Sequence, residues 1–198
     1  MQTIEFVASE HLFGEATRLF DSRLAEGFWA RFVRPGPVLD IGYKGGNPQA
    51  TPLFRDSIGI DMDTPGYDGH NLPVANASVG TVHASHLLEH IADYAQFFRE
   101  VFRVLAPGGT LILMVPLMHT YEMSAVGPSR WNPDHKRFYT AARLLQEIET
   151  SLDRGSYRVA HMRERINLND LVRDPNQHAA GPYEIECVVE KIIPGSIY

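Results

Sequence analysis

The stretch Val38-Leu39-Asp40-Ile41-Gly42-Tyr43-Lys44-Gly45-Gly46 reads as a buried strand that ends near an acid and then turns on glycines. A second apolar run, residues 57–60, ends in another acid, Asp61. A strand, a glycine turn and a second strand tipped by an acid form the plan of a nucleoside site in an open α/β sheet. Glycine allows the backbone to turn tightly and to approach a ligand. Asp61 is placed to accept hydrogen bonds from the two hydroxyls of a ribose.

Composition sets the class of protein. The chain has 198 residues, of which 44% are hydrophobic and 21% charged, so we expect one globular domain over residues 1–198. The net charge of −6 argues against nucleic acid as the main partner. The single cysteine, Cys187, excludes an internal disulfide and is expected in the core. With neither a signal peptide nor a membrane-length apolar run, the chain is expected to be cytoplasmic and without a membrane partner. A homodimer remains open.

Residues 1–36 are predicted to form an N-terminal helical segment. Apolar residues recur with a period near 3.6 over residues 9–33, from Leu12 to Phe32, which indicates one or two amphipathic helices with a joint at Gly27. Two placements are open for this segment. It either covers the nucleoside site as a lid or packs on one face of the sheet.

The connection after Asp61 is unusually short. Six residues, Met62 to Tyr67, separate Asp61 from Asp68, whereas a βαβ crossover takes about 10–12 residues or more. The edge strand that usually follows the second strand is therefore predicted to be reduced or missing. Pro48 and Pro52 allow at most a short helix in the preceding connection.

The remaining pattern alternates strands and helices. Asp93 and Thr140 are expected N-caps of two amphipathic helices. A long segment without periodicity separates a central strand from the second helix and is predicted to be a lid loop. In chain order the pattern predicts a strand at 79–84, a helix after Asp93, a strand at 110–116, the lid loop at 117–139, a helix after Thr140, and an antiparallel strand pair at 157–161 and 184–193.

The segment from Leu72 to Pro116 carries a family resemblance. Leu72-Pro73, then Ser78-Val79-Gly80-Thr81-Val82-His83-Ala84-Ser85-His86-Leu87-Leu88-Glu89-His90-Ile91, then Phe98-Arg99-Glu100-Val101-Phe102-Arg103-Val104-Leu105-Ala106-Pro107-Gly108-Gly109, resembles the class I S-adenosylmethionine-dependent methyltransferases. The resemblance covers roughly residues 36–150. It implies a Rossmann-like, doubly wound α/β sheet of six to seven strands, mostly parallel with an antiparallel C-terminal strand. It also implies S-adenosylmethionine as the cofactor.

Position by position, the resemblance also implies a set of cofactor-binding residues. Asp40, Gly42 and the Gly45-Gly46 turn would hold the methionine part of the cofactor, and Asp61 would bind the ribose. Asp68 and Gly69 would contact the adenine, and Ser85 and His86 would face the sulfonium. These residues are Asp40, Gly42, Gly45, Gly46, Asp61, Asp68, Gly69, Ser85 and His86.

The sequence leaves two alternative functions to consider. A non-catalytic methyltransferase-like binding or scaffold protein is the main alternative, because Tyr43 and Lys44 stand where the family usually has small residues. This alternative predicts an apolar or aromatic side chain that fills the pocket beside Gly42 to Gly46. A nicotinamide-dependent oxidoreductase is disfavoured, because the chain lacks the Gly-x-Gly-x-x-Gly turn that lays a pyrophosphate on a helix N-terminus.

The predicted catalytic residues lie in or near the lid loop. Methyl transfer from a sulfonium is an in-line displacement that relies largely on positioning, but a hydroxyl acceptor benefits from a base. We predict His135, Asp134 and His119 as catalytic residues, with Tyr121 and Tyr139 as further candidates. Asp134 could hold the tautomer of His135. The alternative is that both residues pin the lid to the next helix.

A metal site is not predicted. His86 and His90 are four residues apart, but the string lacks the spacing and the third ligand of a zinc protease. His119 with Asp134 and His135 could bind a divalent cation, although nothing in the sequence specifies further ligands.

The lid loop also suggests the kind of substrate. Its aromatic and arginine side chains suit a sugar or another polar ring, so a small-molecule or glycan acceptor is predicted. The stretch Ser129 to Thr140 is similar to bacterial methyltransferase-like proteins that act in cell-surface polysaccharide pathways.

Overall fold

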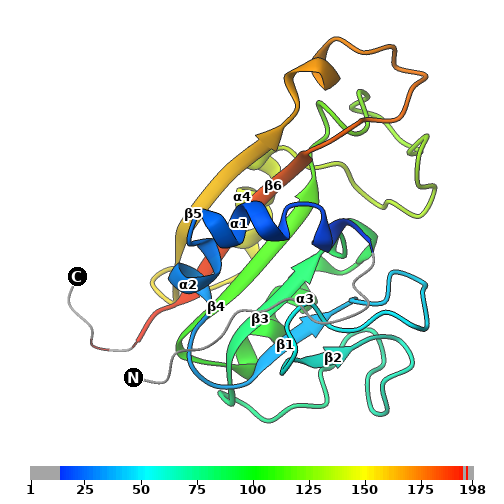
Figure 1. Cartoon of the computed structure of the whole chain (residues 1–198). Coiled ribbons are helices and arrows are strands. Elements are labelled where there is room, and N and C mark those ends of the chain that lie inside the picture. Colours follow the sequence, from blue (N-terminus) through cyan, green and yellow to red (C-terminus); the bar gives the residue numbers. More distant parts are fainter. Residues whose placement is uncertain (1–13, 194, 196–198) are drawn as a thin grey trace.

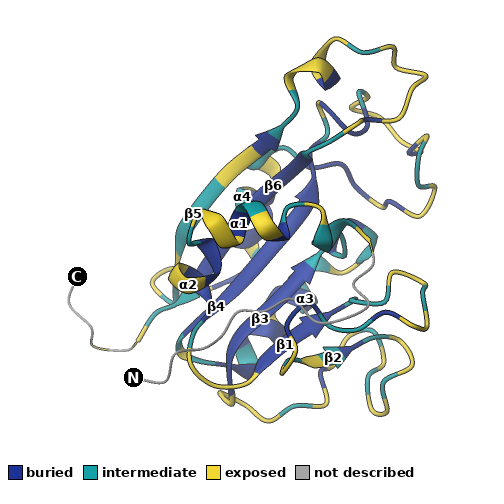
Figure 2. Cartoon of the chain, viewed as in Figure 1, coloured by how far each residue is buried: buried dark blue, intermediate teal, exposed yellow. Residues whose placement is uncertain are grey.

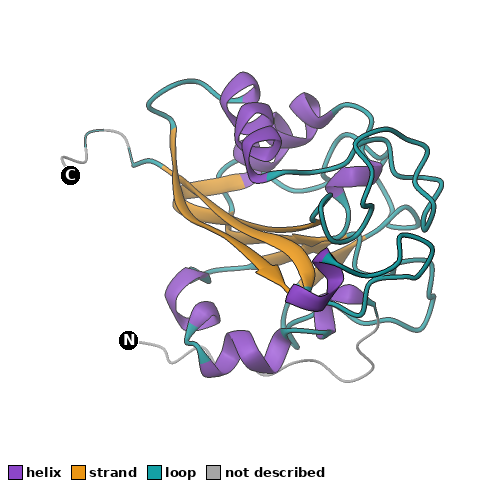
Figure 3. Cartoon of the chain, turned by 90° about the horizontal axis from the view of Figure 1, so that it is seen from above, coloured by secondary structure: helices purple, strands orange, loops and turns teal. Residues whose placement is uncertain are grey.

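A computed structural model describes residues 14–193 and residue 195. A six-stranded sheet forms its middle layer, and helices cover both faces (Figure 3). The first four strands in spatial order are parallel, β6 is antiparallel to β4, and β5 is antiparallel to β6. The spatial order is β2 (Ile58–Ile60), β1 (Val38–Ile41), β3 (Val79–Ser85), β4 (Leu105–Pro116), β6 (Tyr183–Lys191) and β5 (Tyr157–Ile166).

This arrangement confirms the predicted α/β fold and the antiparallel C-terminal strand. The sheet ends at β2, which has three residues, so the predicted loss of the next edge strand is also confirmed. The segment between β1 and β2 contains turns and no helix. Prolines at positions 48 and 52 explain this, because each lacks a backbone N–H and restricts the residue before it.

The central strand β4 is buried on both faces. Residues 111–115 are each 0% exposed, as expected for a continuous apolar run in a sheet with helices on both sides. The strand begins at Leu105, five residues before the predicted start at Thr110, because Leu105 pairs with Val79 of β3. Figure 2 shows β4 as buried, whereas the edge strands β2 and β5 are largely intermediate or exposed.

Two helices on one face begin at the predicted caps. Asp93 Oδ1 accepts a hydrogen bond from the Gln96 N–H (2.9 Å) at the start of α3 (Tyr94–Val104). Thr140 Oγ1 accepts one from the Arg143 N–H (3.2 Å) at the start of α4 (Ala141–Ser151). Both helices pack against the largest apolar cluster of the sheet.

The opposite face is covered by α1 (Phe20–Ala25) and α2 (Phe28–Phe32). The predicted joint is confirmed, because Gly27 separates the helices with a φ of 71°, a conformation that glycine adopts without strain. Trp29 is fully buried in an apolar cluster that includes residues of β4 and β6. The helices therefore pack on the sheet. Residues 1–13, including the predicted helical position Leu12, lie outside the described residues.

Three short 3₁₀ helices complete the described elements: η1 (Glu15–Thr17), η2 (Leu88–His90) and η3 (Leu168–Leu171). Residues 118–138 contain no helix or strand, in agreement with a loop, and cross the carboxyl end of the sheet (Figure 1). Its action as a lid stays a prediction, as does the single domain over residues 1–198. In the described part of the chain, no helix is long and apolar enough to cross a lipid bilayer.

Candidate functional site

A cavity of about 570 Å³ lies at the carboxyl ends of β1, β2 and β3. In the sheet, β2 lies on one side of β1 and β3 lies on the other. The cavity therefore lies at the point where the strand order reverses. Open α/β sheets bind their ligands at this position. Its walls come from strand ends, from η1 and from the lid loop. They include Asp40, Gly42, Gly45, Gly46, Asp61, Ser85, His86, Glu15, Glu89, His90, Tyr121, Asn132, Asp134 and His135.

Asp61 is held by backbone donors at the end of β2. Its Oδ2 accepts a hydrogen bond from the Lys44 N–H (3.0 Å), and its Oδ1 accepts one from the Met62 N–H (2.8 Å). A carboxylate has about four acceptor sites, so Asp61 retains acceptor capacity toward the cavity. This position suits the predicted contact with ribose hydroxyls.

The glycine turn after β1 packs closely at Gly42 and leaves open space at Gly45 and Gly46, where a Cβ would meet none of the described atoms within 4 Å. Gly42 has a φ of +75°, and a Cβ there would lie 2.8 Å from Leu87 Cδ1. The ring of Tyr43 packs over Gly59, where a Cβ would lie 2.5 Å from Tyr43 Cε1. The Lys44 side chain extends to Asp63. Tyr43 thus forms part of the wall and does not fill the cavity, which counts against the scaffold alternative.

Asp40 clamps the wall of the cavity. It is 3% exposed. Its Oδ2 accepts a hydrogen bond from the Leu53 N–H (2.6 Å), and its Oδ1 lies 2.7 Å from His83 Nδ1. Both oxygens therefore have protein partners, and the predicted contact with the cofactor stays a prediction.

Ser85 and His86 line the cavity at the end of β3. The Ser85 Oγ is buried without a hydrogen-bond partner among the described residues. Unpaired buried polar groups are uncommon and often mark a ligand site. His86 Nε2 lies 3.2 Å from Glu184 Oε2. Burial alone would lower the pKa of His86, but the hydrogen bond to Glu184 and the charge of Glu89 raise it above its ordinary value.

Asp68 and Gly69 lie outside the main cavity. Asp68 is exposed, and hydrogen bonds from Asn71 and His70 lower the pKa of its carboxyl to about 2. Gly69 lines a separate hollow of about 10 Å³, together with Ile41. Because Ile41 also lines the main cavity, the hollow adjoins it. Their contact with adenine stays a prediction.

The predicted pairing of Asp134 with His135 is wrong. His135 Nδ1 lies 2.8 Å from Glu122 Oε1, whereas Asp134 Oδ2 lies 3.0 Å from His90 Nδ1. Side chains adjacent in an irregular loop point in different directions, so each finds a partner remote in sequence. Glu122 therefore holds the His135 tautomer, the role expected of Asp134. Nothing in the local sequence distinguishes Glu122 from a solvated loop acid.

The other catalytic candidates divide between the cavity and its surroundings. Tyr121 lines the cavity, and burial raises the pKa of its hydroxyl to about 12. His119 is exposed and does not line the cavity. Tyr139 is fully buried and donates to Glu147 Oε2 (2.8 Å) away from the cavity. A catalytic role for His119 stays a prediction without a contact in the structure that supports it.

Comparison with known families places most of the chain in one group. Residues 10–178 match the family described as "Methyltransferase domain". A solved S-adenosylmethionine-dependent methyltransferase of Aquifex aeolicus superposes with a TM-score of 0.55 and 13% identity, over 91% of this chain and 100% of that one. A Haloferax volcanii chain from a complex with the Trm112 methyltransferase activator superposes with a TM-score of 0.58 and 16% identity, over 90% and 94% of the two chains. Identities this low support the fold alone.

Sequence relatives match over a shorter segment. A Mycolicibacterium smegmatis protein named "Probable S-adenosylmethionine-dependent methyltransferase" is 40% identical over 80 residues, which cover 40% of this chain and 30% of that protein. The chain thus spans less than a third of the length of the curated relatives it matches.

Proposed function

Because the chain belongs to the methyltransferase domain family, we propose that it transfers a methyl group from S-adenosylmethionine to a hydroxyl of a small polar molecule or glycan. The observation that carries the proposal is the cavity where the acids and glycines of β1 and β2 meet the end of β3. Its volume of about 570 Å³ lies within the ordinary range of small-molecule sites, about 300–1,000 Å³.

The residues in the cavity fit the cofactor. Gly45 and Gly46 line the cavity with open space beside them, because a Cβ at either position would meet none of the described atoms within 4 Å. Asp61 offers acceptor capacity to a diol, and Ser85 Oγ is buried without a hydrogen-bond partner among the described residues. Bound S-adenosylmethionine supplies a methyl group on a sulfonium, whose S–CH₃ bond breaks as the acceptor oxygen forms its bond to carbon and loses its proton. Asp61 and the glycine turn orient the cofactor, and the lid loop excludes water.

The acceptor lies at the other end of the cavity. Tyr121, Asn132, Asp134 and His135 line this end and offer donors and acceptors to a hydroxylated molecule. His135 acts on the acceptor, because Glu122 fixes its Nδ1 and leaves Nε2 available at the cavity wall. Tyr121 contributes its flat ring and its protonated hydroxyl, since its pKa is raised to about 12.

Calorimetric titration with S-adenosylmethionine tests the proposal. We expect the purified chain to bind the cofactor. We expect Asp61→Ala to weaken binding about 10-fold or more, because a hydrogen bond to a charged group contributes about 1.5–3 kcal/mol. Asp56→Ala is the matched control, because Asp56 is an exposed acid in the turn just before β2. We expect this variant to bind the cofactor as the wild type does. No binding by the wild type at millimolar cofactor, or equal binding by Asp61→Ala, refutes the proposal.

Acceptor chemistry is tested separately. Release of S-adenosylhomocysteine is measured by mass spectrometry while the protein is offered hydroxylated sugars, nucleotide sugars and small polar ring compounds. Product with at least one hydroxylated acceptor supports the assignment. Cofactor binding combined with methylation of amine or thiol acceptors alone contradicts the hydroxyl assignment.

A further inference from the structure

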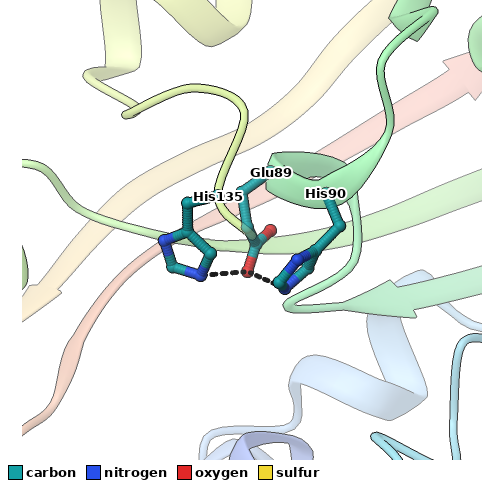
Figure 4. Close-up of side chains that lie close together, drawn as sticks. All are labelled: Glu89, His90 and His135. Carbon is teal, nitrogen blue, oxygen red and sulfur yellow. Dashed lines mark ion pairs between the residues drawn. The ribbon is translucent and has the colours of Figure 1, made fainter. Parts of the chain in front are cut away.

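Three side chains converge at the acceptor end of the cavity. Glu89 and His90 come from η2, and His135 comes from the lid loop (Figure 4). Glu89 Oε1 lies 3.9 Å from His90 Nε2 and 3.9 Å from His135 Nε2. One ligand atom from each residue lies within 4.8 Å of the other two. All three residues line the cavity.

Glu89 is buried, and its nearest side-chain partners are the rings of three histidines, His86 at 3.8 Å and His90 and His135 at 3.9 Å. Its side chain is 0% exposed, and neither carboxylate oxygen has a hydrogen bond among the described residues. A separation of 3.9 Å is too long for a hydrogen bond, which requires about 3.2 Å or less. In the described part of the chain, no arginine or lysine lies within ion-pair distance of Glu89. Burial of a carboxylate that makes no hydrogen bond costs several kcal/mol, and a cation bound at this position would offset that cost.

Two further carboxylates, Glu122 and Asp134, orient the two histidines. Glu122 Oε1 lies 2.8 Å from His135 Nδ1, and Asp134 Oδ2 lies 3.0 Å from His90 Nδ1. Since a carboxylate only accepts hydrogen bonds, Nδ1 of each ring carries the hydrogen. Nε2 of each ring then lies on the side of Glu89, where it can bind a metal ion. Histidines that bind metal ions show this arrangement, because the outer carboxylate fixes the tautomer and raises the basicity of the ligand.

We propose that Glu89, His90 and His135 bind a divalent transition-metal ion, such as Zn²⁺ or Mn²⁺, at the acceptor end of the cavity. Two imidazoles and one carboxylate favour these ions over Mg²⁺ and Ca²⁺, which prefer oxygen ligands. A tetrahedral ion with bonds of about 2.1 Å separates its ligands by about 3.4 Å. The observed 3.9 Å separations therefore close by about half an ångström on binding. Three protein ligands leave a coordination position free.

A bound ion would give His135 a different role in the proposed methyl transfer. This role rests on the proposed function. A hydroxyl of the acceptor would occupy the open position and lose its proton to solvent, because coordination lowers the pKa of an oxygen ligand, for water from 15.7 to about 7. The resulting oxygen anion attacks the methyl carbon. His135 then acts as a ligand and not as the proton acceptor.

Metal titration of the purified chain tests the site without any need for activity. Tag-free protein is stripped with a chelator and titrated with Zn²⁺, Mn²⁺ and Mg²⁺ by calorimetry. We expect one ion per chain, tighter binding of Zn²⁺ and Mn²⁺ than of Mg²⁺, and thermal stabilisation by the bound ion. His90→Ala and His135→Ala lose about 100-fold or more in affinity, and Glu122→Gln loses about 10- to 100-fold because it supports a ligand.

His70→Ala is the matched control, since His70 is exposed and does not line this cavity. Circular dichroism shows whether each variant is folded. If a histidine variant does not fold, the metal affinity of Glu122→Gln still tests the proposal. The proposal is overturned if the wild type binds no ion at millimolar concentration, if Mg²⁺ binds most tightly, or if His135→Ala binds as the wild type does.

Cofactor titration of the same stripped protein separates the two proposals. Binding of S-adenosylmethionine without a metal site overturns the metal proposal and leaves methyl transfer intact. Metal binding without cofactor binding overturns methyl transfer and leaves the metal site intact.

Discussion

Asp40 offers a quantitative test of how the cavity wall is held. The side chain is 3% exposed and joins three segments: its own strand β1, the Leu53 N–H of the following connection, and His83 Nδ1 of β3. Asp40→Ala removes the acceptor from both partners. Each buried polar group left unpaired costs about 1–3 kcal/mol. Allowing for some relaxation, we expect a loss of about 3 kcal/mol in the free energy of unfolding, or about 6–12 °C in Tm.

Asp40→Asn keeps the shape and is expected to cost much less. The amide oxygen can accept from the Leu53 N–H, and the amide NH₂ can donate to His83 Nδ1 if the imidazole changes tautomer. His83 Nε2 is buried without a hydrogen-bond partner among the described residues, so it gives up no hydrogen bond when it gains the proton. We expect a loss of about 1 kcal/mol for this variant.

Urea denaturation followed by circular dichroism measures both variants, with exposed Asp56→Ala as the control. The reasoning fails if Asp40→Asn is as destabilising as Asp40→Ala, because the charge and not the hydrogen bonds would then hold the wall. It also fails if Asp40→Ala lies within about 0.5 kcal/mol of the wild type.

Three further predictions concern Gly80, Glu100 and Cys187. Gly80→Ala places a Cβ 2.2 Å from the backbone oxygen of Pro35, so we expect a loss of about 3 kcal/mol or more in the free energy of unfolding. At Gly155, a Cβ would meet none of the described atoms within 4 Å, so Gly155→Ala should lose only about 1–2 kcal/mol, because of its positive φ. Equal losses of the two variants in urea denaturation would contradict this. Arg103 and the Leu72 N–H lower the pKa of the Glu100 carboxyl, so Glu100→Gln should be about 1 kcal/mol less stable than the wild type at pH 7. The wild type loses this advantage as the pH falls through the lowered pKa, so the difference in thermal melts should close only below about pH 4, and a difference that is the same at all pH values would refute it. Burial raises the pKa of the Cys187 thiol to about 12, so a thiol reagent at pH 8 should react only after unfolding in urea; rapid labelling of the native protein would show that the core opens easily.

The local patterns that are readable in the sequence are those in which neighbouring residues decide the structure. The caps at Asp93 and Thr140, the joint at Gly27 and the apolar run of β4 depend on hydrogen bonds or burial within a few residues, and each was predicted correctly. The short connection after Asp61 likewise predicted the missing edge strand, because chain length limits what can be built there. The acids of β1 and β2 are brought together because carboxyl ends of parallel strands meet at one edge of the sheet.

The chemistry of the acceptor end depended on the tertiary structure. The loop that carries His135 has no periodicity, so the sequence could not say which way each side chain points. Folding pairs His135 with Glu122 and not with Asp134, leaves His119 outside, and places Glu89 between His90 and His135. A buried, unpaired carboxylate is a property of packing that no local pattern records. The sequence by itself therefore determined the methyltransferase-domain family and the edge of the sheet where the candidate site lies, and only the tertiary structure decided which side chains line the proposed acceptor end.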